Sequence, residues 1–260
     1  MHRGDARRVL ATLQEGRFHC VITSPPYFWQ RDYDVEGQIG KEPQVEDYVE
    51  SIADVMDGVK RVLRRDGLLF LNLGDTYYSA KGEPKGIDRK NAARRFGLRA
   101  VDASGLAMPR KTAIGIPWRV ALKMIERNWT LRSPIVWQRE GSLPEPTAKD
   151  RPHRTYEMLF MFSQSPRYYF SRDALGKGVE DIWKISSRPK STNGVHSAAF
   201  PEALVEKCLR VGCPEGGHVL DPFAGSGTVL RVALRSHRLA VGIDLNETFC
   251  EYMARELGSL

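Results

Sequence analysis

The residues with the clearest chemical potential lie in a short proline corner. Ser24, Pro25, Pro26 and Tyr27 follow the apolar run 21–23. Two consecutive prolines fix the backbone and remove two N–H donors, so nearby oxygens keep their capacity to accept hydrogen bonds. Taken alone, this tetrapeptide is typical of a plain turn or an exposed docking peptide. Its position directly after a strand, together with the glycine-rich turn at 221–228, indicates instead a rigid set of acceptors beside an aromatic ring.

A second chemically informative stretch is VLDPFAGSGTVL, residues 219–230. An apolar run ends at Asp221, a tight turn carries Gly225 and Gly227, and a helical pattern follows. Glycines in such a turn let the backbone approach a ligand and present a helix N-terminus to it. Asp244 ends the next apolar run, where a carboxylate meets ribose hydroxyls in nucleotide-binding βαβ units. The stretch therefore predicts a nucleotide-type ligand.

The glycine spacing distinguishes between two nucleotide cofactors. The dinucleotide fingerprint requires a third glycine three residues after the second, but position 230 is Leu. Asp221, just before the turn, could face a cationic group such as the amine of S-adenosylmethionine (SAM). The pattern favours SAM over a nicotinamide cofactor.

Alternating strand and helix signals must position these residues. Apolar residues recur at helical spacing in 45–65, where Gly67 is expected to end the helix, and further helices are predicted at 116–126, 199–211 and 229–234. Buried strands are predicted at 21–23, 68–73, 131–137, 157–162, 218–221 and 239–243. This alternation predicts an α/β fold with a mostly parallel sheet and helices on both faces.

The two chemical stretches together resemble the motifs of the amino-methylating DNA methyltransferases. TSPPY (23–27) resembles their catalytic motif and DPFAGSGT (221–228) their SAM-binding motif. The catalytic motif comes first, which is similar to the β-group, whose sheet is circularly permuted. The resemblance implies a Rossmann-like, SAM-dependent methyltransferase fold in a single catalytic domain, residues 1–260, with the SAM site completed by the first residues of the chain.

The resemblance also implies residue roles. Ser24, Pro25, Pro26 and Tyr27 are the expected catalytic residues: the Ser24 hydroxyl and the Pro25 carbonyl would hold the two N–H groups of an exocyclic amine. Tyr27 would stack on a flipped base, with Phe28 or Trp29 extending that wall. The expected SAM-binding residues are Asp5, Ala6, Phe200, Pro201, Asp221, Pro222, Phe223, Gly225, Gly227, Thr228, Asp244 and Asn246.

The expectation for the target base depends on one residue. Many adenine-N6 enzymes of the group carry Asp where this chain has Ser24, whereas Ser is more typical of cytosine-N4 enzymes. Methylation at cytosine C5 is disfavoured because none of the four cysteines follows a proline. Four alternatives stay open: adenine-N6 methylation, methylation of RNA or a protein amide, nicotinamide-dependent oxidoreduction, and DNA binding by an inactive methyltransferase fold.

The charge distribution points to nucleic acid. The formal net charge is +7, and basic residues strongly outnumber acids between Lys81 and Lys111. We expect double-stranded DNA with a short target site as the partner, contacted by inserted loops at about 80–111 and 138–156 and a short recognition region to about 196. The protein could act as a monomer or a homodimer. The expected DNA contacts are Lys81, Lys85, Arg89, Lys90, Arg94, Arg95, Arg151, Arg154 and Arg188.

Several classes are excluded by what the sequence does not contain. No apolar run approaches the length of a membrane span, and the N-terminus has no secretory signal pattern. Cys20, Cys208, Cys213 and Cys250 have no metal-ligand spacing, which predicts reduced thiols and no metal site. These features are typical of a cytoplasmic protein, and the family resemblance implies a bacterial, archaeal or phage origin.

Overall fold

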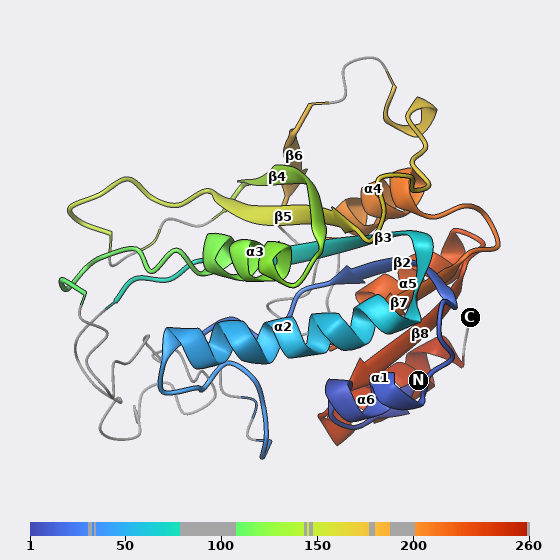
Figure 1. Ribbon diagram of the computed structural model, residues 1–260. Helices are drawn as coiled ribbons and strands as arrows, with labels where there is room; N and C mark the ends of the chain where they lie inside the picture. The colour runs from blue at the N-terminus through green and yellow to red at the C-terminus, as the bar shows by residue number, and fades with distance from the viewer. Residues whose placement is uncertain are drawn as a thin grey trace.

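The computed structural model describes residues 1–30, 33, 35–78, 108–142, 145, 148–176, 180–187 and 201–258. These residues form an eight-stranded sheet in the order β1-β8-β7-β2-β3-β5-β4-β6 (Figure 1). The strands are β1 (His2–Arg3), β2 (Phe18–Thr23), β3 (Leu63–Leu73), β4 (Thr130–Glu140), β5 (Tyr156–Ser163), β6 (Ile182–Ser186), β7 (His218–Asp221) and β8 (Leu239–Asp244).

The sheet is mostly parallel, as predicted. Strand β2 is parallel to both of its neighbours, β3 and β7, and β8 is parallel to β7 and β1. Strand β5 runs antiparallel to β3 and β4, while β6 is parallel to β4. The first residues of the chain therefore lie beside the last strand, with His2 opposite Ile243.

Helices cover both faces of the sheet. They are α1 (Ala6–Thr12), α2 (Val45–Val62), α3 (Ile116–Glu126), α4 (Glu202–Gly212), α5 (Thr228–Arg235) and α6 (Glu247–Leu257), with a short 3-10 turn, η1, at Asp173–Leu175. One apolar cluster joins α1, α2 and α3 to one face, and a second joins α4, α5 and Met253 of α6 to the other. Leu69 and Leu71 of β3 point into the first cluster and Leu68 and Phe70 into the second. This alternation is why the strand reads as a continuous apolar run.

Some element boundaries differ from the prediction. Helix α2 ends at Val62 rather than at 65, and Gly67 lies inside β3. A Cβ at Gly67 would be 2.9 Å from the His19 carbonyl oxygen, so this glycine permits close packing of two strands rather than ending the helix. Helix α4 begins at Glu202 instead of 199. The predicted loop 138–156 is also shorter, because β4 continues to Glu140 and β5 begins at Tyr156.

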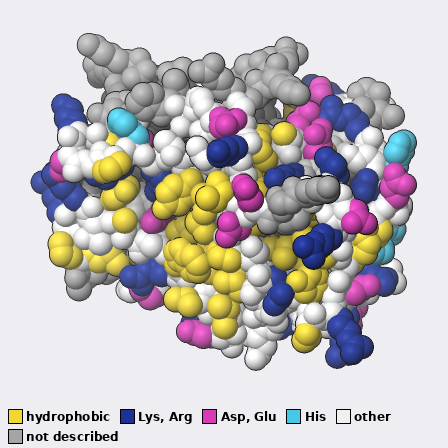
Figure 2. All heavy atoms as spheres, turned by 90° about the horizontal axis from the view of Figure 1, so that it is seen from above, with side chains coloured by type: hydrophobic (Ala, Val, Ile, Leu, Met, Phe, Trp, Pro, Cys, Tyr) yellow, Lys and Arg dark blue, Asp and Glu magenta, His cyan; other side chains and the backbone are white. Residues whose placement is uncertain are grey.

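Figure 2 shows hydrophobic side chains gathered near the middle of one face, with Lys and Arg side chains around them. Cys20, Cys208 and Cys213 are buried free thiols, and Cys250 is a partly buried free thiol. Within the described ranges, no helix is long and apolar enough to cross a membrane. No cluster of His, Cys, Asp and Glu side chains among these residues could hold a metal ion.

Candidate active site

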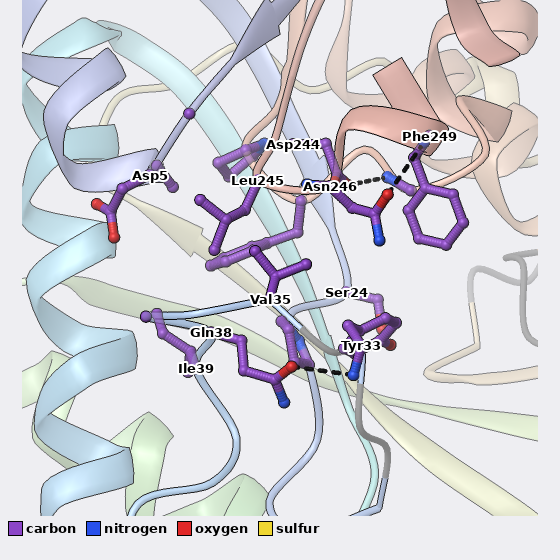
Figure 3. Close-up of a pocket in the computed structure, with 17 residues that line it drawn as sticks. Asp5, Ser24, Tyr33, Val35, Gln38, Ile39, Asp244, Leu245, Asn246 and Phe249 are labelled. Carbon is purple, nitrogen blue, oxygen red and sulfur yellow. Dashed lines mark hydrogen bonds between the residues drawn. The ribbon is translucent and has the colours of Figure 1, made fainter. Parts of the chain in front are cut away.

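A cavity opens where β2, β7 and β8 end (Figure 3). Its volume is about 680 Å³ when the open space at its entrance is counted. The lining comes from five parts of the chain, namely Gly4, Asp5 and Ala6; Ser24 and Pro26; Tyr33, Val35, Gly37, Gln38 and Ile39; Pro222, Phe223 and Gly225; and Asp244, Leu245, Asn246 and Phe249. The carboxyl edge of parallel strands is where α/β sheets bind ligands.

This cavity brings together the proline corner at 24–27 and the glycine turn at 221–228. Ser24 and Pro26 line the same space as Gly225 and Asp244. Seven of the expected cofactor residues are in the lining: Asp5, Ala6, Pro222, Phe223, Gly225, Asp244 and Asn246. Pro201, Asp221, Gly227 and Thr228 are described but not in the lining, and Phe200 lies outside the described residues.

The glycine turn is held open by Asp244. The Gly225 N–H donates to Asp244 Oδ2 over 2.7 Å, and the Asn246 N–H donates to Oδ1 over 2.8 Å. Burial raises the pKa of the Asp244 carboxyl. Gly225 has a φ of 51°, and a Cβ built on it would meet nothing within 4 Å. The turn therefore leaves space at the cavity wall for a ligand to approach the backbone.

Gly227 and Asp221 have structural partners instead. A Cβ at Gly227 would be 2.8 Å from Met253 Cγ, so this glycine lets α5 pack on α6. Asp221 is only 3% exposed and accepts from Thr23 Oγ1 over 2.7 Å and from the Phe223 N–H over 3.0 Å. Burial raises the pKa of Asp221 to about 7. Asp221 thus ties β2 to the glycine turn, whereas we expected it to face a cationic group.

Two polar residues at the cavity mouth also cap helices. Asp5 caps α1 by accepting from the Arg7 N–H over 2.9 Å, and the Arg7 guanidinium donates to its second oxygen over 2.7 Å. These contacts hold the pKa of Asp5 below its usual value. Asn246 caps α6 by accepting from the Phe249 N–H. Helix capping therefore fixes these side chains at the mouth.

The two proline carbonyls of the corner differ in their hydrogen bonds. The Tyr48 hydroxyl, fully buried on α2, donates to the Pro26 carbonyl over 2.9 Å. Among the described residues, no hydrogen bond reaches the Pro25 carbonyl oxygen. The Ser24 hydroxyl donates to the Tyr27 hydroxyl over 3.2 Å. Two oxygens of the corner, Ser24 Oγ and the Pro25 carbonyl, therefore keep accepting capacity.

Tyr27 is anchored at its hydroxyl. It donates to Glu157 Oε2 over 2.7 Å and lies 3.1 Å from Asn72 Oδ1. Burial and the Glu157 carboxylate raise the pKa of this phenol well above its usual value. Its ring lies against Gly74, where a Cβ would be 2.6 Å from Cε2. The hydroxyl contacts and Gly74 therefore hold the ring in place, in a residue that is partly exposed as a whole.

Phe28 and Trp29 do not extend the aromatic wall. Phe28 is 1% exposed and packs on Tyr48 with a centroid distance of 5.3 Å. Trp29 is 7% exposed and donates its Nε1–H to the Glu42 carbonyl over 2.7 Å. The expectation for these two rings was wrong because both belong to the core that supports the corner.

Six lining residues have no motif or periodicity that could have predicted them: Tyr33, Val35, Gly37, Gln38, Ile39 and Phe249. Gln38 accepts from the Tyr33 N–H over 2.9 Å, and its buried Nε2 has no hydrogen-bond partner among the residues that the structure describes. A buried unsatisfied donor at a cavity wall suits an acceptor on a ligand. Together with two carboxylates and the apolar walls of Phe223 and Ile39, it makes the cavity suitable for a nucleoside-like molecule.

Two expected DNA contacts are paired within the protein. Arg151 forms an ion pair with Glu145 over 2.6 Å and lies 3.8 Å above the Tyr77 ring, and Arg154 is 3.7 Å from Glu145. Both arginines line a second cavity of about 820 Å³ that also includes Glu157 and Trp118. The other seven expected contacts lie outside the described residues: Lys81, Lys85, Arg89, Lys90, Arg94, Arg95 and Arg188.

Comparison with known proteins gives a consistent match. Residues 18–256 match the DNA methylase family N6_N4_Mtase. The chain is 37% identical to the type II methyltransferase M.Cfr9I of Citrobacter freundii, over 99% of this chain and 87% of the relative. It is 39% identical to M.XycI of Xanthomonas campestris pv. cyanopsidis, over the same shares.

Solved structures share the fold. The PvuII DNA methyltransferase, described as cytosine-N4-specific, superposes with a TM-score of 0.73 at 21% identity, over 97% of this chain and 83% of that chain. A putative DNA modification methylase from Thermus thermophilus, in complex with S-adenosyl-L-methionine, gives a TM-score of 0.67 at 23% identity, over 99% and 94%.

Proposed function

This chain belongs to the DNA methylase family of N6 and N4 amino-methyltransferases, which use S-adenosyl-L-methionine, and on that premise we propose that it methylates N4 of cytosine in DNA. The observation that carries the proposal is the shared cavity. Ser24 and Pro26 border the same space as Gly225 and Asp244, so acceptors for an amine lie next to a nucleoside site.

The residues of the cavity fit the cofactor. Gly225 leaves room for close approach, and the Asp244 and Asp5 carboxylates can accept from ribose hydroxyls and an adenine amine. Gln38 Nε2 can donate to an oxygen of the ligand. When bound, the cofactor supplies an electrophilic methyl group carried on a sulfonium.

The proline corner prepares the nucleophile. An exocyclic amine is a weak nucleophile because its lone pair is delocalised into the ring. Ser24 Oγ and the Pro25 carbonyl each accept one of its N–H bonds, which fixes the nitrogen and stabilises the positive charge that develops as it attacks. Tyr48 occupies the Pro26 carbonyl, so the Pro25 carbonyl is the acceptor left for the substrate. In this proposal the ring of Tyr27 stacks on the flipped base.

Ser24 favours cytosine over adenine, because many adenine-N6 enzymes of the group carry Asp at that position. The fold likeness to a cytosine-N4-specific enzyme is consistent with this choice. The net charge of +7 suits double-stranded DNA, with a short target site read by the basic segments near 80–111 and around Arg151 and Arg154. Residues 1–260 act as one catalytic domain in this proposal.

The proposal is tested in cells that lack DNA methyltransferases. DNA from cells expressing the protein is hydrolysed, its nucleosides are identified by mass spectrometry, and long-read sequencing locates the modified sites. We expect N4-methylcytosine in one short sequence context, and none in cells expressing Ser24→Ala. N6-methyladenine alone would establish the adenine alternative. Unmodified DNA, with radiolabelled methyl groups transferred to RNA or protein, would overturn the proposal.

A further inference from the structure

A hydrogen-bonded series of side chains connects the two cavities of the molecule. Ser24 lines the cofactor cavity and donates to the Tyr27 hydroxyl over 3.2 Å. Tyr27 donates to Glu157 Oε2 over 2.7 Å, and Glu157 lines the second cavity. Tyr27 lies in the loop after β2 and Glu157 lies on strand β5, and the two residues are 130 positions apart in the sequence.

The direction of these hydrogen bonds is set by Glu157. Its Oε1 accepts from Arg139 Nη1 over 3.1 Å, and its Oε2 accepts from Tyr27. The second neighbour of the phenol, Asn72, donates its amide Nδ2 to the Met158 carbonyl over 3.1 Å, so its Oδ1 faces Tyr27. The Tyr27 hydroxyl thus meets two acceptors with one proton, and the shorter contact to a carboxylate holds it.

The consequence falls on Ser24. Because the phenol proton is directed at Glu157, the Tyr27 oxygen can only accept from Ser24. The Ser24 proton is then committed to Tyr27, and its lone pairs are left for another donor. A serine hydroxyl without such a partner rotates and can point its proton at an incoming amine, which would oppose binding of the N–H group.

We propose that Glu157 is a positioning residue that, through Tyr27, fixes the Ser24 hydroxyl as an acceptor for the target amine. This inference rests on the proposed function, because it assigns a cause to the acceptor role of Ser24. Glu157 does not line the cofactor cavity, so its contribution is to the orientation of one hydrogen bond.

The position of Glu157 at the second cavity allows chemical rescue. Glu157→Ala removes the carboxylate and enlarges that cavity, and added formate can occupy the vacated place. Because Asn72 Oδ1 remains as a second acceptor for the phenol proton, we expect the single-turnover methylation rate of Glu157→Ala to fall about two- to tenfold, with SAM affinity unchanged. Formate should restore at least a third of the loss, while sodium chloride at equal ionic strength should not.

A second variant separates polarity from packing. Glu157→Gln keeps the shape but offers one carbonyl oxygen, which Arg139 engages, so the amide nitrogen faces Tyr27 and reverses the hydrogen bond. We expect the same loss of rate as in Glu157→Ala and no rescue by formate, because the space is filled. Glu140→Gln, exposed on β4, is the matched control and should keep the wild-type rate.

Three outcomes overturn the inference: wild-type rates in Glu157→Gln, a loss in Glu157→Ala that formate does not relieve, or a matching loss of SAM affinity. Failure of the proposed function is a different result, since wild-type protein would then leave DNA unmodified. A melting temperature measured for each variant identifies a loss caused by unfolding. Rescue by formate in a Glu157→Ala variant that this measurement shows to be folded supports the inference.

Discussion

At the scale of single residues, the sequence predicted those site residues that lie next to a strand end. Ser24 follows β2 and Asp244 ends β8, so a local pattern was enough to place both at one edge of the sheet. Glu157 and Gln38 had no such pattern. Glu157 contacts the corner only because β5 pairs with β3 over residues distant in sequence, and Gln38 belongs to a connection without periodicity.

Ser24→Ala tests the acceptor directly. The hydroxyl is removed without a change in the backbone, and the cofactor contacts of the glycine turn are untouched. We expect SAM affinity within about twofold of wild type and transfer slowed by about a hundredfold or more, as for the loss of an oriented hydrogen-bond partner in a transition state. Calorimetry gives the affinity and single-turnover kinetics the rate. An unchanged rate would mean that the hydroxyl takes no part.

Asp221 predicts a dependence of stability on pH. Its pKa is about 7 in the folded protein against an ordinary value of 3.8, so between these values the folded state binds the extra proton. The free energy of unfolding therefore falls as pH rises through this window, and the loss is complete above pH 7. Asp221→Asn keeps an acceptor for Thr23 and stays neutral at every pH.

Urea unfolding at pH 5 and pH 8 measures this effect. Relative to wild type, Asp221→Asn should gain about 3 kcal/mol between the two values, since one pKa unit corresponds to about 1.4 kcal/mol. Taking the difference between the two proteins cancels the titration of all other groups. A difference in the free energy of unfolding between the two proteins that is the same at pH 5 and pH 8 would show that the carboxyl ionises normally despite its burial.

At the scale of elements, the sequence located helices and strands but not every boundary. Arg64 and Arg65 continue the helical pattern of α2 past Val62, whereas in the structure they begin β3, where Arg64 pairs with Asp66. Strand β1 and helix α1 are too short to show periodicity. Their placement depends on pairing with β8, which the family resemblance implied and local sequence did not.

The end of β3 sets the position of the Tyr27 ring. Gly74→Ala would place a Cβ 2.6 Å from Tyr27 Cε2, so the ring and the corner must shift. We expect the rate of methyl transfer to fall at least about tenfold, because moving a positioned group by about 1 Å strongly lowers the rate of the reaction. SAM affinity should be unchanged, since Gly74 is not in the cofactor cavity. Wild-type transfer by this variant would show that the ring position is not critical.

At the scale of the whole molecule, the order of the motifs predicted the architecture. With the catalytic stretch first and the glycine turn near the end, the chain start must return to the last strand, and β1 does pair with β8. Figure 1 shows the two termini near each other at that side of the sheet. The identity of the DNA-reading side chains does not follow from motif order, because surface charges carry no periodicity.

The net charge of the molecule predicts salt-sensitive DNA binding. Neutralising Lys81, Lys85, Arg89 and Lys90 should flatten the slope of log affinity against log salt by up to about 0.9 for each phosphate that the variant no longer neutralises. Arg65→Ala, at the opposite end of β3, should leave the slope unchanged. Fluorescence anisotropy with a duplex at several salt concentrations measures both. If the variant with all four substitutions kept the wild-type slope of log affinity against log salt, these residues would not belong to the DNA interface.

The central claim is that the proline corner beside the cofactor cavity holds the amine of a flipped base for methylation. A crystal structure of the protein with a target duplex and an unreactive SAM analogue tests it most directly. The account predicts that the target N4 lies about 3 Å from both Ser24 Oγ and the Pro25 carbonyl oxygen. A flipped base whose amine contacts neither oxygen would contradict it.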